Sequence, residues 1–271
     1  MLGQLFKKTP VVDEGTRTWI YDSFLWCLEN FDADYLIKES KAILPSNEYY
    51  PGKCSSGQEM AHTIFTNTLN YAGMSNWPIE LVDISNHHVE PMPQLSLSYP
   101  LRGKKSQVHY LAPIYSIKIP YQVDQIRQPQ DFIAYIVQHL AGIMLAQLNI
   151  TVPGGKELQP QAVDLIACFM GFGVIFANTA YQFKGGCGSC NIRALNRQSA
   201  LPEVETVYAL ALFCVSKGIN PTSIKPHMKS HLFKTLIRAY KEINQHLKDS
   251  NKNEYKSLQI INETTKSAIT V

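Results

Sequence analysis

One histidine on an apolar segment is the first residue whose type and position could do metal chemistry. His139 lies in the run Tyr-Ile-Val-Gln-His-Leu-Ala-Gly-Ile-Met-Leu, residues 135 to 145. A helix that holds hydrolytic zinc carries the pattern H-E-x-x-H, in which two histidines four residues apart bind the metal and the glutamate acts as general base. His139 occupies the first position, but Leu140 replaces the base and Ile143 replaces the second ligand. The residue types predict that this helix does not hydrolyse peptides.

A catalytic zinc ion needs three protein ligands, an open water position and a base for that water. One histidine does not meet this requirement, and Leu140 and Ile143 instead extend the apolar face of a helix. We therefore expect His139 to be a buried neutral imidazole that bonds a backbone carbonyl and a carboxylate, with Asp164 as the candidate carboxylate. Asp164 is also expected to tie two core helices together. An active hydrolase with unorthodox ligands, drawn from His139, Asp164 and the Pro- and Ser-rich stretch 91–107, is the rival hypothesis.

The second candidate for chemistry is the pair Cys187 and Cys190, in the run Gly-Gly-Cys-Gly-Ser-Cys-Asn at residues 185 to 191. Such a pair can belong to a plain glycine-rich loop, to half of a zinc site or to a redox dithiol, and all three interpretations stay open. Zinc would need two more ligands, for which His227 and His231 are the candidates. A redox dithiol is expected between a strand and the helix that follows, whereas this pair follows a long helix. We expect the plain loop, and likewise interpret the cluster at 87–90 (His-His-Val-Glu) as a polar loop.

Length and composition favour a soluble globular protein. The 271 residues are enough for one large domain or two closely packed ones, and the formal net charge of +3 gives no support for a nucleic-acid or membrane partner. The six cysteines lie mostly in apolar segments, as free thiols do in a reducing compartment. No signal peptide is recognisable at the N-terminus, and the longest apolar stretch, 165–177, is shorter than a membrane span. We therefore expect a cytoplasmic protein.

The periodicity of apolar residues predicts an α+β fold. Residues 1–125 are expected to form an N-terminal α/β portion with a small sheet, residues 126–250 a helical portion and residues 251–271 a polar tail, in one compact unit. Gly171 and Gly173 are interpreted as sites of close helix packing. The expected elements are helices at 13–31, 56–73, 131–148, 161–181, 202–217 and 229–247, strands at 79–84 and 113–120, and a turn or hairpin within 91–107.

Four segments, in order, carry a resemblance to a known family. An aromatic-rich helix at 19–31 precedes the loop Ile-Leu-Pro-Ser-Asn-Glu-Tyr-Tyr-Pro at 43–51. Later come Val-Asp-Leu-Ile-Ala-Cys-Phe-Met-Gly-Phe-Gly-Val-Ile-Phe-Ala-Asn at 163–178 and Leu-Pro-Glu-Val-Glu-Thr-Val-Tyr-Ala-Leu-Ala-Leu-Phe at 201–213. They resemble the L-P-x-x-E-x-(F/Y)-P, T-D-L…G-x-G-(I/V)-x-x-A-N and L-S-x-x-x-x-x-Y-A-L-A-L-F patterns of a little-studied bacterial group with a minimal zinc-metallopeptidase-like (gluzincin-type) core. Order and approximate spacing hold over residues 15 to 245.

The resemblance implies a zincin-like helical C-terminal half and shows where its metal site would lie. In that group the metal helix reads A-H-E-L-G-H, and a downstream E-P-L-T-D-L supplies the third ligand. His139 matches the first histidine, and Asp164 matches the aspartate of T-D-L. The ligand glutamate falls near Pro160, where the neighbours Gln159 and Gln161 are poor zinc ligands. His139 and Asp164 are thus vestigial positions of a degenerate zinc site.

The resulting hypothesis is a catalytically inactive zinc-metallopeptidase-like protein with a binding or regulatory role. Its ancestral groove, beside the strand at 114–119, is expected to accept an extended protein or peptide partner by strand addition. No cofactor is expected, and zinc is the alternative, either with unorthodox hydrolytic ligands or at Cys187 and Cys190. The thiols of that pair could equally serve a regulatory role. The sequence leaves the oligomeric state open.

Overall fold

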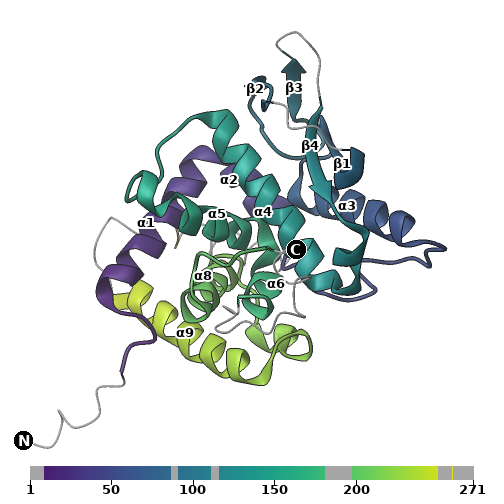
Figure 1. Ribbon diagram of the computed structural model, residues 1–271. Coiled ribbons are helices and arrows are strands. Elements are labelled where there is room, and N and C mark those ends of the chain that lie inside the picture. The colour runs from purple at the N-terminus through teal and green to yellow at the C-terminus, as the bar shows by residue number, and fades with distance from the viewer. Residues whose placement is uncertain (1–8, 87–90, 111–115, 181–196, 250–257, 259–271) are drawn as a thin grey trace, which may run out of the picture.

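The computed structural model describes residues 9–86, 91–110, 116–180, 197–249 and 258. It confirms an α+β fold, in which a mainly helical body carries two small sheets at one end (Figure 1). The two strand pairs lie together at the top of Figure 1. Helices α1, α4 and α9 surround the more central α5, α6 and α8.

Local capping signals mark the start of α1 and both ends of α3. Helix α1 (Glu14–Asn30) starts where the Asp13 carboxylate accepts a 2.9 Å hydrogen bond from the Thr16 N–H, and the short α2 (Ala33–Lys38) follows it. Helix α3 (Gly57–Ala72) is capped by the Ser56 hydroxyl and ends at Gly73, which has the left-handed conformation that glycine adopts readily. These local signals fix both ends of α3.

Each of the two sheets has two strands. Strand β1 (Ile79–Asp83) pairs in parallel with β4 (Ile117–Tyr121), and between them the hairpin β2 (Leu95–Ser98) and β3 (Gln107–Tyr110) pairs antiparallel. A turn or hairpin was predicted within 91–107, and the hairpin that forms extends past this range to Tyr110. The side chain of Gln147 holds it to the body, because its Oε1 accepts from the Leu95 N–H at 2.8 Å and its Nε2 donates to the Pro93 carbonyl at 2.8 Å.

The helical half contains the largest part of the core. Helix α8 is buried at every residue from Thr206 to Ser216, and the buried face of α1 packs against the same apolar core. The N-terminal portion therefore completes the core of the C-terminal one. The described α-helices of this half are α4 (Pro129–Leu148), α5 (Gln159–Ala167), α6 (Gly173–Asn178), α8 (Glu203–Ser216) and α9 (Ser230–Asp249), with short 3-10 turns η2 (Val123–Arg127) and η5 (Pro221–His227).

The predicted continuous helix over 161–181 is wrong in one respect. A π turn (Cys168–Phe172) separates α5 from α6, and Gly171 inside it has a φ of 101°. The freed carbonyl of Gly171 accepts a 2.9 Å hydrogen bond from the Ile43 N–H, so the extended segment after α2 docks on the break. Gly173 fits the close-packing interpretation, because a Cβ there would lie 2.9 Å from the Leu210 side chain of α8.

Among the residues that the structure describes, two helical stretches are long and apolar enough to cross a bilayer by length and composition alone. The first is Pro129–Leu148, and 61% of its most apolar 18-residue window is buried inside the fold. The second is Lys156–Asn178, for which the buried share of that window is 89%. This degree of burial is what the core helices of a soluble protein show. Both stretches are therefore accounted for as core.

Candidate functional site

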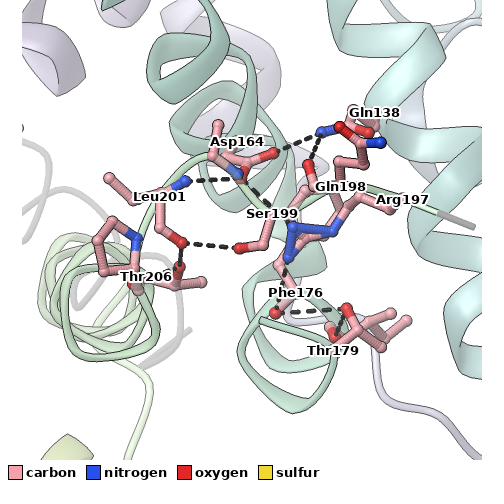
Figure 2. A network of polar contacts seen from close by, with 12 residues as sticks. Gln138, Asp164, Phe176, Thr179, Arg197, Gln198, Ser199, Leu201 and Thr206 are labelled. Carbon is pink, nitrogen blue, oxygen red and sulfur yellow. Dashed lines mark hydrogen bonds and ion pairs between the residues drawn. The ribbon is translucent and has the colours of Figure 1, made fainter. Parts of the chain in front are cut away.

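The carboxylate of Asp164 is fully buried and receives four hydrogen bonds. Gln138 Nε2 donates to its Oδ1 at 2.9 Å, while the backbone N–H groups of Ala200 and Leu201 donate to Oδ2 at 2.9 and 3.0 Å. Arg197 Nη1 completes the set at 3.3 Å (Figure 2). A buried charge is stable only when it is paired and hydrogen-bonded in this way. The prediction that Asp164 ties core helices together is confirmed, since it joins α5 to α4 and to the segment before α8.

Arg197 is the cation of this buried pair. Its side chain is 1% exposed, its Nη2 donates to the Phe176 carbonyl at 3.1 Å, and its guanidinium lies 4.1 Å from the centre of the Phe176 ring. Figure 2 shows it between the Asp164 carboxylate and the carbonyl end of α6. Burial also raises the pKa of the neighbouring Cys168 thiol, and the charge of Asp164 adds to that effect. This arrangement is a structural brace, in which the carboxylate and the guanidinium pair with each other and with backbone groups.

His139 lies beside the brace and does not take part in it. Its Nδ1 is 2.9 Å from the carbonyl oxygen of Tyr135, one turn earlier on α4, and the two rings are 4.2 Å apart. The expected pairing of His139 with Asp164 is wrong, because the preceding residue, Gln138, makes that contact. Adjacent residues point about 100° apart around a helix, so only one of the two can face α5. The expected bond to a backbone carbonyl is confirmed.

Burial lowers the pKa of His139, while its bond to the Tyr135 carbonyl acts in the opposite direction. The folded protein therefore resists protonating His139, whereas the unfolded chain takes up that proton once the pH falls below about 6.5. Because the unfolded state then binds more protons, the free energy of unfolding should decrease as the pH falls through this range. Urea unfolding at about pH 7.5 and about pH 5.5 should show a smaller loss of stability in His139→Gln than in the wild type.

The matched change at the exposed His62, His62→Gln, is expected to keep the wild-type loss of stability on acidification. Equal losses in the wild type and in His139→Gln would show that His139 does not resist protonation in the fold.

Tyr135 closes the space between α4 and β4, where the ancestral groove was expected. Its hydroxyl donates to the Pro120 carbonyl at 2.5 Å, and burial raises the pKa of Tyr135 to about 12. Ile117 faces β1, because its N–H donates to the Pro78 carbonyl at 2.7 Å, so by alternation Pro120 faces the opposite edge. Proline has no N–H to offer there, and its carbonyl is already used. This geometry gives strand addition little support at that position.

Metal ligands do not converge within the described ranges. No group of three or more His, Cys, Asp or Glu side chains that could hold a metal ion occurs there. The exposed His231 is 3.2 Å from Glu203, and His227 lies at a separate surface hollow. Cys187, Cys190 and the cluster at 87–90 lie outside the described residues, so the zinc and thiol hypotheses that depend on them stay predictions.

A groove lies at the N-terminal end of α4, whereas His139 lies near the middle of this helix. A hollow of about 810 Å³ is bounded by the start of α4, the end of α6 and the turn before α9. A second hollow of about 320 Å³ lies between α4 and α3. Pro45, Pro129 and Gln130 line both hollows, so the two hollows are adjacent, and we call them together the Pro45 groove.

Two of the motif segments line the Pro45 groove. One is the loop 43–51, and the other is the end of the 163–178 motif at Asn178. The amide of Asn178 donates to Gln130 Oε1 at 3.1 Å and to the His227 carbonyl at 2.8 Å, and its backbone carbonyl accepts from Lys229 Nζ at 2.7 Å. Asn178 therefore joins the end of α6 to the start of α4 and to the turn before α9, around the larger hollow.

The sequence did not indicate Gln138, Arg197 or Asn178 as interacting residues. Asn178 was visible as the last residue of a motif, but Gln138 and Arg197 carried no signal beyond their polarity beside apolar runs. Comparison with known proteins finds no matching family model, no similar curated protein and no similar solved structure. The gluzincin-type resemblance therefore stays a prediction, and the function has to be argued from the geometry.

Proposed function

We propose that this protein is a non-hydrolytic, zinc-metallopeptidase-like binding protein that holds an extended polypeptide segment in the Pro45 groove. The observation that supports this most is that two motif segments, the loop 43–51 and Asn178, line the groove. At the degenerate metal position, by contrast, Asp164 is committed to a buried brace and His139 to the Tyr135 carbonyl. Binding at the groove replaces the strand-addition hypothesis, for which Pro120 and Tyr135 leave little room.

The chemistry of the groove suits a polypeptide. The smaller hollow has an apolar lining that could receive one large apolar side chain, and Met60 at its edge is 38% exposed. The larger hollow presents the side-chain amides of Gln128 and Gln130 and the imidazole of His227, which can bond a peptide backbone. Pockets of a few hundred Å³ with an apolar lining and a few polar groups are typical ligand sites. The apolar residues of the smaller hollow are Pro45, Tyr50, Pro51, Met60, Ile64 and Ile133.

A substitution that fills the smaller hollow should abolish binding. Thr63 lines this hollow from α3, so Thr63→Arg introduces a long charged side chain where an apolar anchor would sit. We expect peptides selected from a random display library on the wild-type protein to lose at least about tenfold in affinity for Thr63→Arg. Fluorescence anisotropy of the labelled peptides gives both dissociation constants.

Thr66→Arg is the matched control, because Thr66 is exposed on the same helix and does not line the hollow. It should bind the selected peptides as the wild type does. Mass spectrometry after incubation with added zinc should recover those peptides intact. Cleaved peptide would contradict the non-hydrolytic part of the proposal, and equal affinity in both variants would contradict the position of the site.

The proposal includes a cytoplasmic location. The described cysteines Cys27, Cys54, Cys168 and Cys214 are free thiols, and three of them are buried. This agrees with a reducing compartment. Burial raises the pKa of the thiols of Cys27, Cys168 and Cys214, which supports a packing role for them rather than a reactive one.

A further inference from the structure

A second hollow with a different lining lies between the N-terminal segment and α9, away from the Pro45 groove. Its volume is about 550 Å³. We call it the α9 basic pocket, because Arg17, Arg238, Lys241 and His246 all line it. The remaining lining residues are Thr9, Pro10, Val11, Ile237, Glu242 and Gln245.

The fixed charges of the α9 basic pocket do not cancel. Three of its lining side chains are Arg or Lys, and one, Glu242, is a carboxylate. Glu242 already has two partners, since its Oε2 accepts from the Val11 N–H at 2.9 Å and its Oε1 accepts from the Tyr208 hydroxyl at 3.2 Å. The carboxylate therefore serves to hold the N-terminal segment against α9. This leaves an excess of positive charge in the concavity, where it attracts an anion more strongly than on a flat surface.

The basic side chains approach the pocket from two elements. Arg238, Lys241 and Gln245 follow one another at helical spacing and so share one face of α9. Arg17 comes from α1, where it pairs at 3.6 Å with Glu14, whose side chain is 87% exposed. A long pair with so exposed a carboxylate contributes little, so an anion in the pocket could replace Glu14 at low cost. Arg238 Nη2 donates to the Thr9 carbonyl at 3.2 Å, which directs this guanidinium towards the N-terminal wall.

Two guanidinium groups and an ammonium group suit a phosphate group. The planar fork of arginine bonds two phosphate oxygens at once, and lysine adds a point charge. Pro10, Val11 and Ile237 give the same hollow an apolar wall. We propose that the α9 basic pocket binds the phosphate group of a small phosphorylated ligand. This proposal does not depend on the function of the Pro45 groove.

Calorimetric titration at constant ionic strength tests the pocket with two probes, inorganic phosphate and phenyl phosphate. At least one of them should bind saturably at one site per chain. Equal affinity for both probes would identify the bare phosphate group as the feature recognised. Tighter binding of phenyl phosphate would identify an organic phosphomonoester, which uses the apolar wall. Absence of saturable binding by either probe would overturn the proposal.

Variants that remove equal positive charge distinguish a specific phosphate site from general electrostatic attraction of the anion to the protein. The double variant Arg238→Gln with Lys241→Gln should bind the probe at least about tenfold more weakly than the wild type. The control, Lys234→Gln with Lys248→Gln, removes the same charge from exposed positions of α9 that do not line the pocket, and it should keep the wild-type affinity. Equal weakening in the two doubles would overturn the proposal.

A single variant shows whether weaker binding reflects the loss of a ligand-binding group or the loss of folded structure. Arg238→Gln removes the bond to the Thr9 carbonyl, whereas Lys241→Gln removes no hydrogen bond that the structure records between described residues. Lys241→Gln should unfold at the wild-type temperature and still bind the probe several-fold more weakly. Wild-type affinity in this variant would overturn the role of Lys241 in the pocket.

Discussion

Gly171→Ala is expected to destabilise the protein by about 3–4 kcal/mol, more than any other single methyl group added to the described helices. Gly171 has a φ of 101°, which an L side chain rarely adopts, and a Cβ at this position would lie 2.2 Å from the carbonyl oxygen of Lys41. The clash is with backbone, so no change of rotamer relieves it. Relief would require the segment 41–43 to leave the break, which would also stretch the bond from Ile43 to the Gly171 carbonyl. Urea unfolding followed by circular dichroism gives the free energy.

Gly142→Ala is the matched control for this experiment. Gly142 lies inside α4, and a Cβ there would have no neighbouring atom within 4 Å. Alanine is favoured over glycine in a helix interior by about 0.5–1 kcal/mol, so this variant should be more stable than the wild type. The same substitution is thus expected to lower the free energy of unfolding at Gly171 and to raise it at Gly142. A Gly171→Ala variant as stable as the wild type would mean that the chain does not break at this residue.

The elements that the sequence predicted well are those whose ends have local causes. Helix α3 is an example, because Ser56 and Gly73 satisfy its terminal groups from within a few residues. The hairpin expected within 91–107 is present, although it extends to Tyr110, and the apolar face that includes Leu140 and Ile143 was correctly predicted. Each of these depends on the periodicity or the capping of a short segment, which the sequence displays directly.

The break between α5 and α6 could not be predicted in the same way. Gly171 lies in a continuous apolar run. The residues of this run would be the same whether the glycine allowed close helix packing or a positive φ, so the sequence does not distinguish the two. The partner that decides between these two, the carbonyl of Lys41, lies 130 positions earlier in the chain. The parallel pairing of β1 with β4 is likewise a long-range fact, because 33 residues, 84 to 116, separate the two strands.

The polar brace shows why a buried anchor can be predicted from the sequence while its hydrogen-bond partners cannot. Asp164 was predicted to be a buried anchor, and it is one. Two of its donors are the backbone N–H groups of Ala200 and Leu201, which every residue except proline possesses and which leave no trace in a sequence. The third donor, Gln138, is one position away from the expected His139, and a single helical position changes the face entirely.

Asp164→Asn is expected to cost about 3–5 kcal/mol of folding stability, although it changes neither the size nor the shape of the side chain appreciably. The substitution leaves the guanidinium of Arg197, 1% exposed, without its counter-charge. In the wild type, both carboxylate oxygens accept hydrogen bonds, one from Gln138 and the other from the N–H groups of Ala200 and Leu201. The amide of asparagine has only one oxygen, so it cannot accept from both sides. Chemical unfolding monitored by tryptophan fluorescence measures the loss.

Asp34→Asn provides the contrast for this prediction. Asp34 pairs with Lys38 at 2.9 Å, a shorter distance than the 3.3 Å between Arg197 and Asp164, but the side chains of Asp34 and Lys38 are 82% and 67% exposed. Solvent screens the exposed pair, so its loss should cost less than about 1 kcal/mol. If the two single variants lost similar stability, the burial of the Asp164 pair would not be what makes it important.

The double variant Asp164→Asn with Arg197→Met then separates charge from hydrogen bonding. Removing the guanidinium removes the uncompensated charge, while the oxygen of the introduced amide can still accept from the N–H groups that reach Asp164 Oδ2 in the wild type. The double variant should therefore lose about 1–3 kcal/mol less than the sum of the two single losses. Such coupling would show that Arg197 and Asp164 act as one unit that holds α5 to the segment before α8. Strict additivity would instead assign the stability to the separate backbone bonds of Asp164 and to the contact of Arg197 with Phe176.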